Sequence, residues 1–69
     1  MMVNTAKIMN RMKEVGVTQE RIAEALKIAR PTVSQKLRNV RPMYLDEAER
    51  LSELLEIEAA NFGEYFFAQ

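Results

Sequence analysis

TQERIAEALKIARPTVSQKLRNVRP, residues 18–42, is the most informative stretch of this chain. It begins with Thr18, whose hydroxyl suits the N-cap of a helix, and apolar residues then recur at helical spacing as far as Leu26. A second helical segment follows a tight turn and carries a proline in its first turn, where a missing N–H costs nothing. Val33 and Leu37, four residues apart, mark its buried side. The stretch therefore predicts two short helices packed against each other.

The flanking sequence predicts three further helices, at about residues 4–15, 45–55 and 59–66. Gly16 closes the first of them, and acidic residues crowd the N-terminal turns of the second, where they favour the helix dipole. No segment alternates apolar and polar residues as a strand does. We expect an all-α domain of five short helices that spans residues 1–69.

The composition restricts the functions open to the chain. It contains 69 residues with no cysteine and no histidine, which excludes disulfides, the usual zinc sites and catalysis by His or Cys. No Gly-rich phosphate loop or calcium-loop spacing is present. We expect no enzyme activity, cofactor, metal or small-molecule substrate. Because no segment resembles a signal peptide or a membrane span, we also expect a cytoplasmic protein without membrane contact.

The charges are separated along the chain although their total is zero. Residues 1–42 hold nine Lys or Arg and three Glu, a net charge of +6. Residues 43–69 hold one Arg and seven Asp or Glu, a net charge of −6. Such asymmetry suggests nucleic-acid binding and can orient the basic end toward a polyanion. Charge alone fits an accidental distribution equally well. The sequence motif of residues 18–42 therefore has to decide between nucleic-acid binding and an accidental charge distribution.

The two helices at about residues 18–38 have the pattern of a helix-turn-helix. Ala23 supplies a small side chain where the helices cross, and Ile22, Leu26, Ile28 and Val33 are placed to hold the pair at a steep angle. A second helix held in this way stands clear of the surface and can enter the major groove of DNA.

The run TQERIAEALKIARPTVSQKLRNVRPMYLDEAERLSELLEI, residues 18–57, resembles the Cro/phage-repressor helix-turn-helix family of the xenobiotic-response-element type. TQE, the alanine inside the first helix, RPTVSQKL, the RP that follows and LDEAERLSELLEI occur in the family's order and spacing. The resemblance is closest to short phage and prophage regulators. It implies a compact five-helix, lambda-repressor-like domain that binds a palindromic operator in double-stranded DNA as a homodimer. The expected activity is repression of transcription in a bacterial cell or a phage-infected host.

The chain departs from the family pattern at three places. Lys27 stands where a glycine usually occupies the turn, so we expect a positive φ at a non-glycine residue. Ala29 stands where a serine often caps the following helix, so that cap is missing. Arg38-Asn39 replaces an Asn-Gly pair, and Asn39 is expected to end the helix in the left-handed region.

The resemblance places the base-reading positions at the start and outer face of the second helix of the motif. In this sequence they are Arg30, Pro31, Thr32 and Gln35. Arg30 suits guanine O6 and N7, and Gln35 suits adenine N6 and N7. The Thr32 methyl and Pro31 suit thymine methyl groups, although Pro31 fits the role of a helix starter better than that of a reader.

Phosphate contacts are expected on either side of the reading face. Gln19 resembles the family position that meets a phosphate at a helix N-terminus, and Thr18 lies beside it. The other expected contacts are Lys36, Arg38, Arg41 and Tyr44. For Tyr44, packing against the following helix is an equal alternative.

The C-terminal aromatic residues are too many for a short last helix to bury in so small a domain. Phe62 and Phe66, four residues apart, are the best candidates for the core. A self-complementary dimer patch is assigned to Tyr65, Phe66 and Phe67, with burial of all of them as the alternative.

Two other functions stay open. A protein-interaction module on the same fold, such as an antirepressor or an assembly factor, fits the acidic second half of the chain. An antitoxin that represses its own operon fits the DNA-binding class. The acids after Leu45 are expected to lie on a solvated helix surface: Glu47, Glu49, Glu53 and Glu56.

Overall fold

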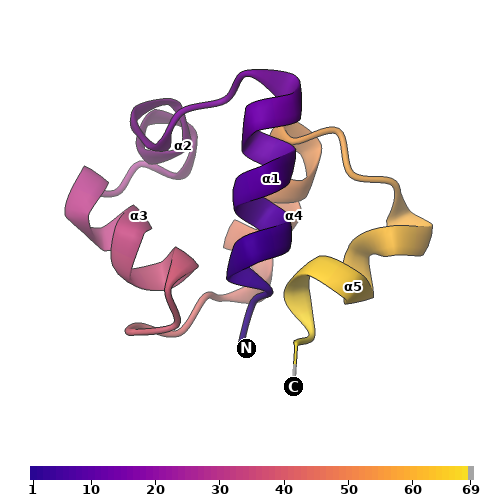
Figure 1. The fold of residues 1–69 in the computed structure, drawn as a ribbon. Helices are drawn as coiled ribbons and strands as arrows, with labels where there is room; N and C mark the ends of the chain where they lie inside the picture. The colour runs from indigo at the N-terminus through magenta and orange to yellow at the C-terminus, as the bar shows by residue number, and fades with distance from the viewer. Residues whose placement is uncertain (69) are drawn as a thin grey trace.

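Helices make up the regular structure of residues 1–68, the part of the chain that the computed structural model describes (Figure 1). In chain order they are α1 (Thr5–Val15), α2 (Gln19–Leu26), α3 (Arg30–Leu37), α4 (Leu45–Leu54), the 3-10 turn η1 (Ala59–Asn61) and α5 (Phe62–Phe66). These residues contain no strand. The predicted all-α domain of five helices is therefore confirmed, with the last predicted helix divided into η1 and α5.

Helix α1 stands at the centre of the view in Figure 1, in front of α4, with α2 and α3 on its left and α5 on its right. Helix α2 packs against both α3 and α4, whereas α5 packs against α1 on the opposite side. The two ends of the chain lie side by side, because the Asn4 N–H donates to the Tyr65 carbonyl at 2.8 Å and the Ala68 N–H donates to the Met2 carbonyl at 3.0 Å. The result is a globule in which α2 and α3 form one flank.

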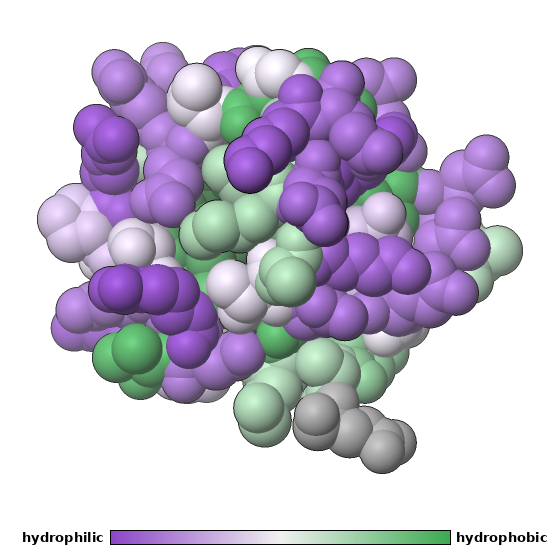
Figure 2. Space-filling view, in the orientation of Figure 1, coloured by the Kyte–Doolittle hydropathy of each residue, from purple (hydrophilic) through white to green (hydrophobic). Residues whose placement is uncertain are grey.

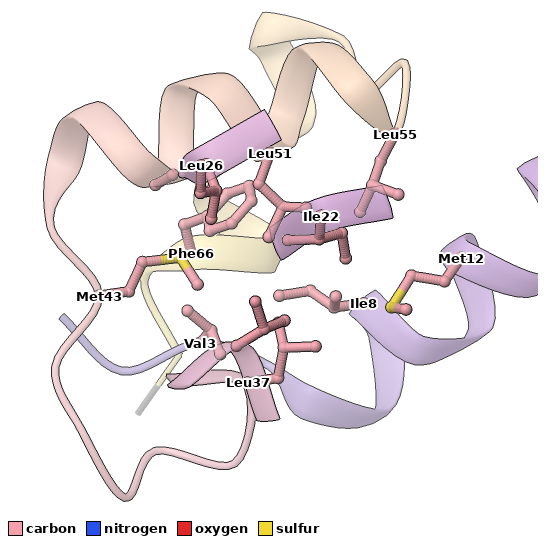
Figure 3. Close-up of a cluster of buried hydrophobic side chains, with 12 residues drawn as sticks. Val3, Ile8, Met12, Ile22, Leu26, Leu37, Met43, Leu51, Leu55 and Phe66 are labelled. Carbon is pink, nitrogen blue, oxygen red and sulfur yellow. The ribbon is translucent and has the colours of Figure 1, made fainter. Parts of the chain in front are cut away.

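The core takes a fully buried side chain from each of the five α-helices (Figure 3). From α1 to α5 these are Ile8, Ile22, Leu37, Leu51 and Phe66. Burial of a large apolar side chain contributes about 1.5–3 kcal/mol, so each of these residues stabilises the packing of its helix by about that amount. Burial of Phe66 confirms its assignment to the core and is incompatible with its assignment to an exposed dimer patch.

Side-chain caps start α1 and α2, and the cap at Thr18 was predicted from the sequence. The Asn4 side chain accepts a hydrogen bond from the Lys7 N–H at 3.1 Å, and the Thr18 hydroxyl accepts one from the Arg21 N–H at 3.2 Å. Ala29 precedes α3 without a side-chain cap, also as expected.

A residue with positive φ follows each of the helices α1 to α4. These residues are Gly16 at 71°, Lys27 at 57°, Asn39 at 62° and Glu56 at 55°. In each case the next N–H donates to a carbonyl five residues earlier in the chain, which satisfies an acceptor at the helix end. The left-handed conformations predicted for Lys27 and Asn39 are confirmed, and the one at Glu56 was not foreseen.

None of the helices in residues 1–68 has the length and apolar character needed to cross a membrane. Within the same residues, no three acidic side chains come together as a metal ion would require.

Candidate functional site

Helix α3 is anchored along one side and exposed along the other. Val33 and Leu37 are buried against the rest of the bundle, and Ile28 in the preceding turn packs on the same core. The Thr5 hydroxyl donates to the Leu37 carbonyl, which satisfies an acceptor at the C-terminal end of α3. The helix therefore has a defined orientation relative to α1 and α2.

The outer face of α3 carries three of the predicted base-reading residues. Arg30 and Pro31 are exposed at its start, and Gln35 is half-buried one turn beyond Pro31. Arg38 continues this face and is exposed. Thr32 is half-buried. The predicted positions thus occur together on one helix.

Ser34 is a polar residue of α3 that the sequence reasoning did not select. It is half-buried and lies four residues after Arg30, so the two share one side of the helix. This four-residue spacing from Arg30 is the sequence signal by which Ser34 could have been selected. A hydroxyl there can both donate and accept hydrogen bonds.

The N-terminus of α2 carries two of the six predicted phosphate contacts. Thr18 is exposed and its oxygen caps the helix, while Gln19 is half-buried as the first helical residue. Because α2 packs against α3, these two residues belong to the same structural unit as Arg30, Pro31 and Gln35.

Lys36 does not lie where a phosphate contact was expected. The residue is only 6% exposed. Its Nζ lies 2.8 Å from Glu47 Oε1 and 3.0 Å from the Pro42 carbonyl oxygen. The ammonium is thus directed into the protein. Lys36 follows Val33 by three residues and adjoins Leu37, a spacing that already placed it near the buried side.

Glu47 is also more buried than expected, because its carboxylate pairs with the Lys36 ammonium. Its side chain is 13% exposed, although it was expected on a solvated surface. The carboxylate also accepts the Tyr44 N–H at 2.9 Å, which helps to start α4. Glu49, Glu53 and Glu56 are exposed as expected.

Tyr44 combines packing and exposure. Lys36 Nζ lies 4.6 Å from the centre of its ring, within the range of a cation–π contact. The residue is nevertheless 61% exposed. The contact on the ring thus comes from a side chain of α3 and not from the following helix, and most of the residue faces solvent.

Hydrogen bonds hold the loop between α3 and α4 at several of its residues. The N–H groups of Val40 and Arg41 both donate to the Gln35 carbonyl, at 2.8 and 3.3 Å. The Asn39 amide accepts the Val3 N–H at 2.8 Å and donates to the Val3 carbonyl at 3.0 Å. Arg41 is exposed on this loop.

The surface around α3 has positive charges without internal partners. Among residues 1–68, the side chains of Arg30, Arg38 and Arg41 form no ion pair. In contrast, Lys7 pairs with Glu64 at 2.8 Å, and that hydrogen bond raises the pKa of Lys7 above its ordinary value of 10.5. No acidic residue occurs between Arg30 and Tyr44, so this positive surface is uninterrupted along the sequence.

The predicted dimer residues divide between core and surface. Phe66 is fully buried, Tyr65 is half-buried, and Phe67 is 58% exposed. Two exposed apolar residues that sequence reasoning missed, Met2 and Val40, border one shallow hollow. Figure 2 shows apolar surface gathered along the lower edge of the molecule, near the two chain ends of Figure 1.

No protein-family model matches the chain, and no curated protein matches it significantly.

Proposed function

We propose that this protein is a sequence-specific, double-stranded-DNA-binding transcriptional regulator of the Cro/phage-repressor type. The observation that carries the proposal is the outer surface of α3 and its following loop. There, exposed Arg30, Arg38 and Arg41 lie before and after half-buried Gln35 along the chain, with no acidic residue between Arg30 and Arg41 in the sequence. Such a helix, supported from behind by α2, has the arrangement that a major-groove reader needs.

The residues of this surface are assigned two kinds of contact. Arg30 reads guanine through O6 and N7, and Gln35 reads adenine through N6 and N7. Arg38 and Arg41 contact phosphates, which give affinity and salt dependence but no sequence information. The further phosphate contacts are Thr18, Gln19 and the exposed side of Tyr44. Lys36 is left out of this set because its ammonium is occupied.

A palindromic operator requires two copies of the domain. Half-sites one helical turn apart place two recognition helices about 34 Å from each other. The domain measures 28 × 24 × 20 Å, so two copies in contact are large enough to span that distance. We assign the contact to the exposed apolar residues near the chain ends, with Phe67 as the aromatic member. Repression then follows from occlusion of the promoter by the bound dimer.

The experiment that tests the proposal is selection from a pool of randomised duplexes at two salt concentrations. Wild type is expected to enrich a palindrome. The double variant Arg30→Ala/Gln35→Ala is expected to keep only salt-sensitive, non-specific affinity. Arg50→Ala is the matched control, because it removes an exposed arginine from α4 instead of α3. Enrichment of one sequence by the double variant would contradict the assignment of α3.

The second candidate is a protein-interaction module, which the exposed acids of α4 favour. Asp46, Glu49 and Glu53 give this helix a surface that repels DNA. This alternative predicts no duplex affinity for wild type even at low salt. It also predicts a protein partner whose binding is insensitive to Arg30→Ala and Gln35→Ala.

A further inference from the structure

We infer that Lys36 and Glu47 are positioning residues that hold the basic loop of residues 38–42 in the conformation that meets DNA. The part of this inference that concerns DNA rests on the proposed function. In this role Lys36 contacts no phosphate itself, and it acts through Arg38 and Arg41.

The Lys36 ammonium connects three parts of the chain. It donates to the Pro42 carbonyl at 3.0 Å, at the end of the loop, and to Glu47 on α4 at 2.8 Å. Its third neighbour is the Tyr44 ring, at 4.6 Å. Glu47 in turn accepts the Tyr44 N–H at 2.9 Å. The pair therefore fixes the place where the chain leaves α3 and enters α4.

The opposite side of the loop is held by the N-terminal segment. The Asn39 amide forms two hydrogen bonds with the backbone of Val3, at 2.8 and 3.0 Å. The loop is thus attached at residue 39 and at residue 42, while Arg38 and Arg41 remain exposed. A loop already ordered in the free protein loses less conformational entropy when it binds, which raises affinity.

Stability alone is a poor explanation for this ion pair. Burial removes two charges from water, and replacing such a pair by apolar side chains is often neutral or stabilising. The Lys36–Glu47 pair also bonds the loop backbone, which apolar side chains would not do. Its geometry is suited to setting a backbone conformation.

The inference is tested by measuring the DNA affinity of the variant Glu47→Gln. The matched control is Glu49→Gln. Both variants remove one negative charge from α4, but only Glu47 contacts Lys36 within the described residues. We expect Glu49→Gln to leave affinity unchanged or slightly higher, and Glu47→Gln to lower it about tenfold. If Lys36 were a phosphate ligand, loss of its partner would release it and strengthen binding. Stronger binding by Glu47→Gln would therefore overturn the inference.

A double-mutant cycle separates a direct contact from a positioning role. In wild type, Lys36→Met is expected to weaken DNA binding about tenfold. In the background Arg38→Ala/Arg41→Ala the same change is expected to cost less than about twofold, because the side chains that Lys36 positions are gone. Equal effects in the two backgrounds would show that Lys36 acts independently of the two arginines.

Amide hydrogen exchange without DNA makes the inference testable even if the proposed function fails. In Lys36→Met, exchange at the N–H groups of Val40 and Arg41 should accelerate about tenfold or more. The Val17 N–H, which donates to the Met12 carbonyl at 2.9 Å in the corresponding turn after α1, is the internal control. Equal acceleration at Val17 would mean general destabilisation and would overturn the positioning role. Absence of DNA binding by wild type, with the loop effect intact, would instead reject only the DNA-binding proposal.

Discussion

At Lys27 the backbone takes a φ of 57°, a conformation in which the β-carbon of an L residue crowds the following carbonyl. The turn accepts this strain because the Ile28 N–H reaches the Ala23 carbonyl at 3.1 Å and Ile28 itself packs against the core. The family resemblance places a glycine here, and glycine adopts this conformation without the penalty.

Lys27→Gly is therefore expected to stabilise the domain by about 1 kcal/mol. Urea denaturation monitored by circular dichroism measures the change in the free energy of unfolding. Lys13→Gly is the control, because Lys13 is an exposed residue within α1. There the same substitution should destabilise by about 0.5–1 kcal/mol. Destabilisation by both variants would show that the turn is not strained.

Phe66 and Phe67 are adjacent in sequence and opposite in environment. Phe66 is fully buried, whereas Phe67 is 58% exposed. Phe66→Ala should lower the free energy of unfolding by about 3–5 kcal/mol through lost burial and the cavity left behind. Phe67→Ala should change it by less than about 0.5 kcal/mol in the monomer. Thermal unfolding at low protein concentration compares them, and equal losses would contradict the orientation of α5.

At the scale of elements, the four left-handed residues give α1 to α4 the same kind of ending. The residues after them are apolar: Val17, Ile28, Val40 and Ile57. Three of these pack against the core, as expected for this type of helix end, but Val40 is 66% exposed. The exception occurs where the chain leaves α3, beside the arginines of the proposed DNA surface.

Arg11 connects two elements by capping the C-terminal end of α4 from α1. Its Nε donates to the Leu55 carbonyl at 2.8 Å, and its Nη2 donates to the Glu56 carbonyl at 3.0 Å. Both carbonyls lie just after the last residue of α4, where the negative end of the helix dipole favours a cation. Arg11→Met should destabilise the domain by about 1–2 kcal/mol in chemical denaturation. Lys13→Met on the same helix should have little effect, and similar losses for both would show that the cap does not contribute.

At the scale of the whole molecule, residues 1–42 carry a net charge of +6 and residues 43–69 a net charge of −6. The charges that can act on DNA are those of exposed side chains without an ion pair inside the protein. If Arg38 and Arg41 each contact a phosphate, replacing either by Ala should reduce the slope of log affinity against log salt by about 1. Titrations at several salt concentrations measure the slope. Arg50→Ala should leave it unchanged, and a slope unaffected by all three variants would place the DNA elsewhere.

Self-association also concerns the whole molecule. Phe67→Ser is expected to shift the protein from dimer to monomer, because it removes the exposed aromatic ring from the proposed contact surface. Sedimentation equilibrium gives the mass. Leu45→Ser is the control, since Leu45 is an equally exposed apolar residue at the start of α4. An unchanged dimer mass for Phe67→Ser would move the interface to another surface.

The residues by themselves determined the helices, the Thr18 cap and the face of α3, and the family resemblance indicated the left-handed turn at Lys27. The helices, the cap and the face depend on interactions among residues at most five apart, so spacing and residue type are sufficient to predict them. The assignment of Arg30 and Gln35 to base reading remains a proposal from the family resemblance.

Only the tertiary structure decided where the remaining side chains lie. The pairing of Lys36 with Glu47 and the hydrogen bonds between the Asn39 side chain and the Val3 backbone, a clamp on the start of the chain, were not visible in the sequence. The sequence favoured Phe66 for the core but also assigned it to the dimer patch, and only its burial excluded the second assignment. The clamp joins residues 36 positions apart, and no local pattern encodes such a contact. A lysine on the border of a helix can face water or a buried carboxylate. Which of these it does depends on the neighbouring helix that packing places beside it.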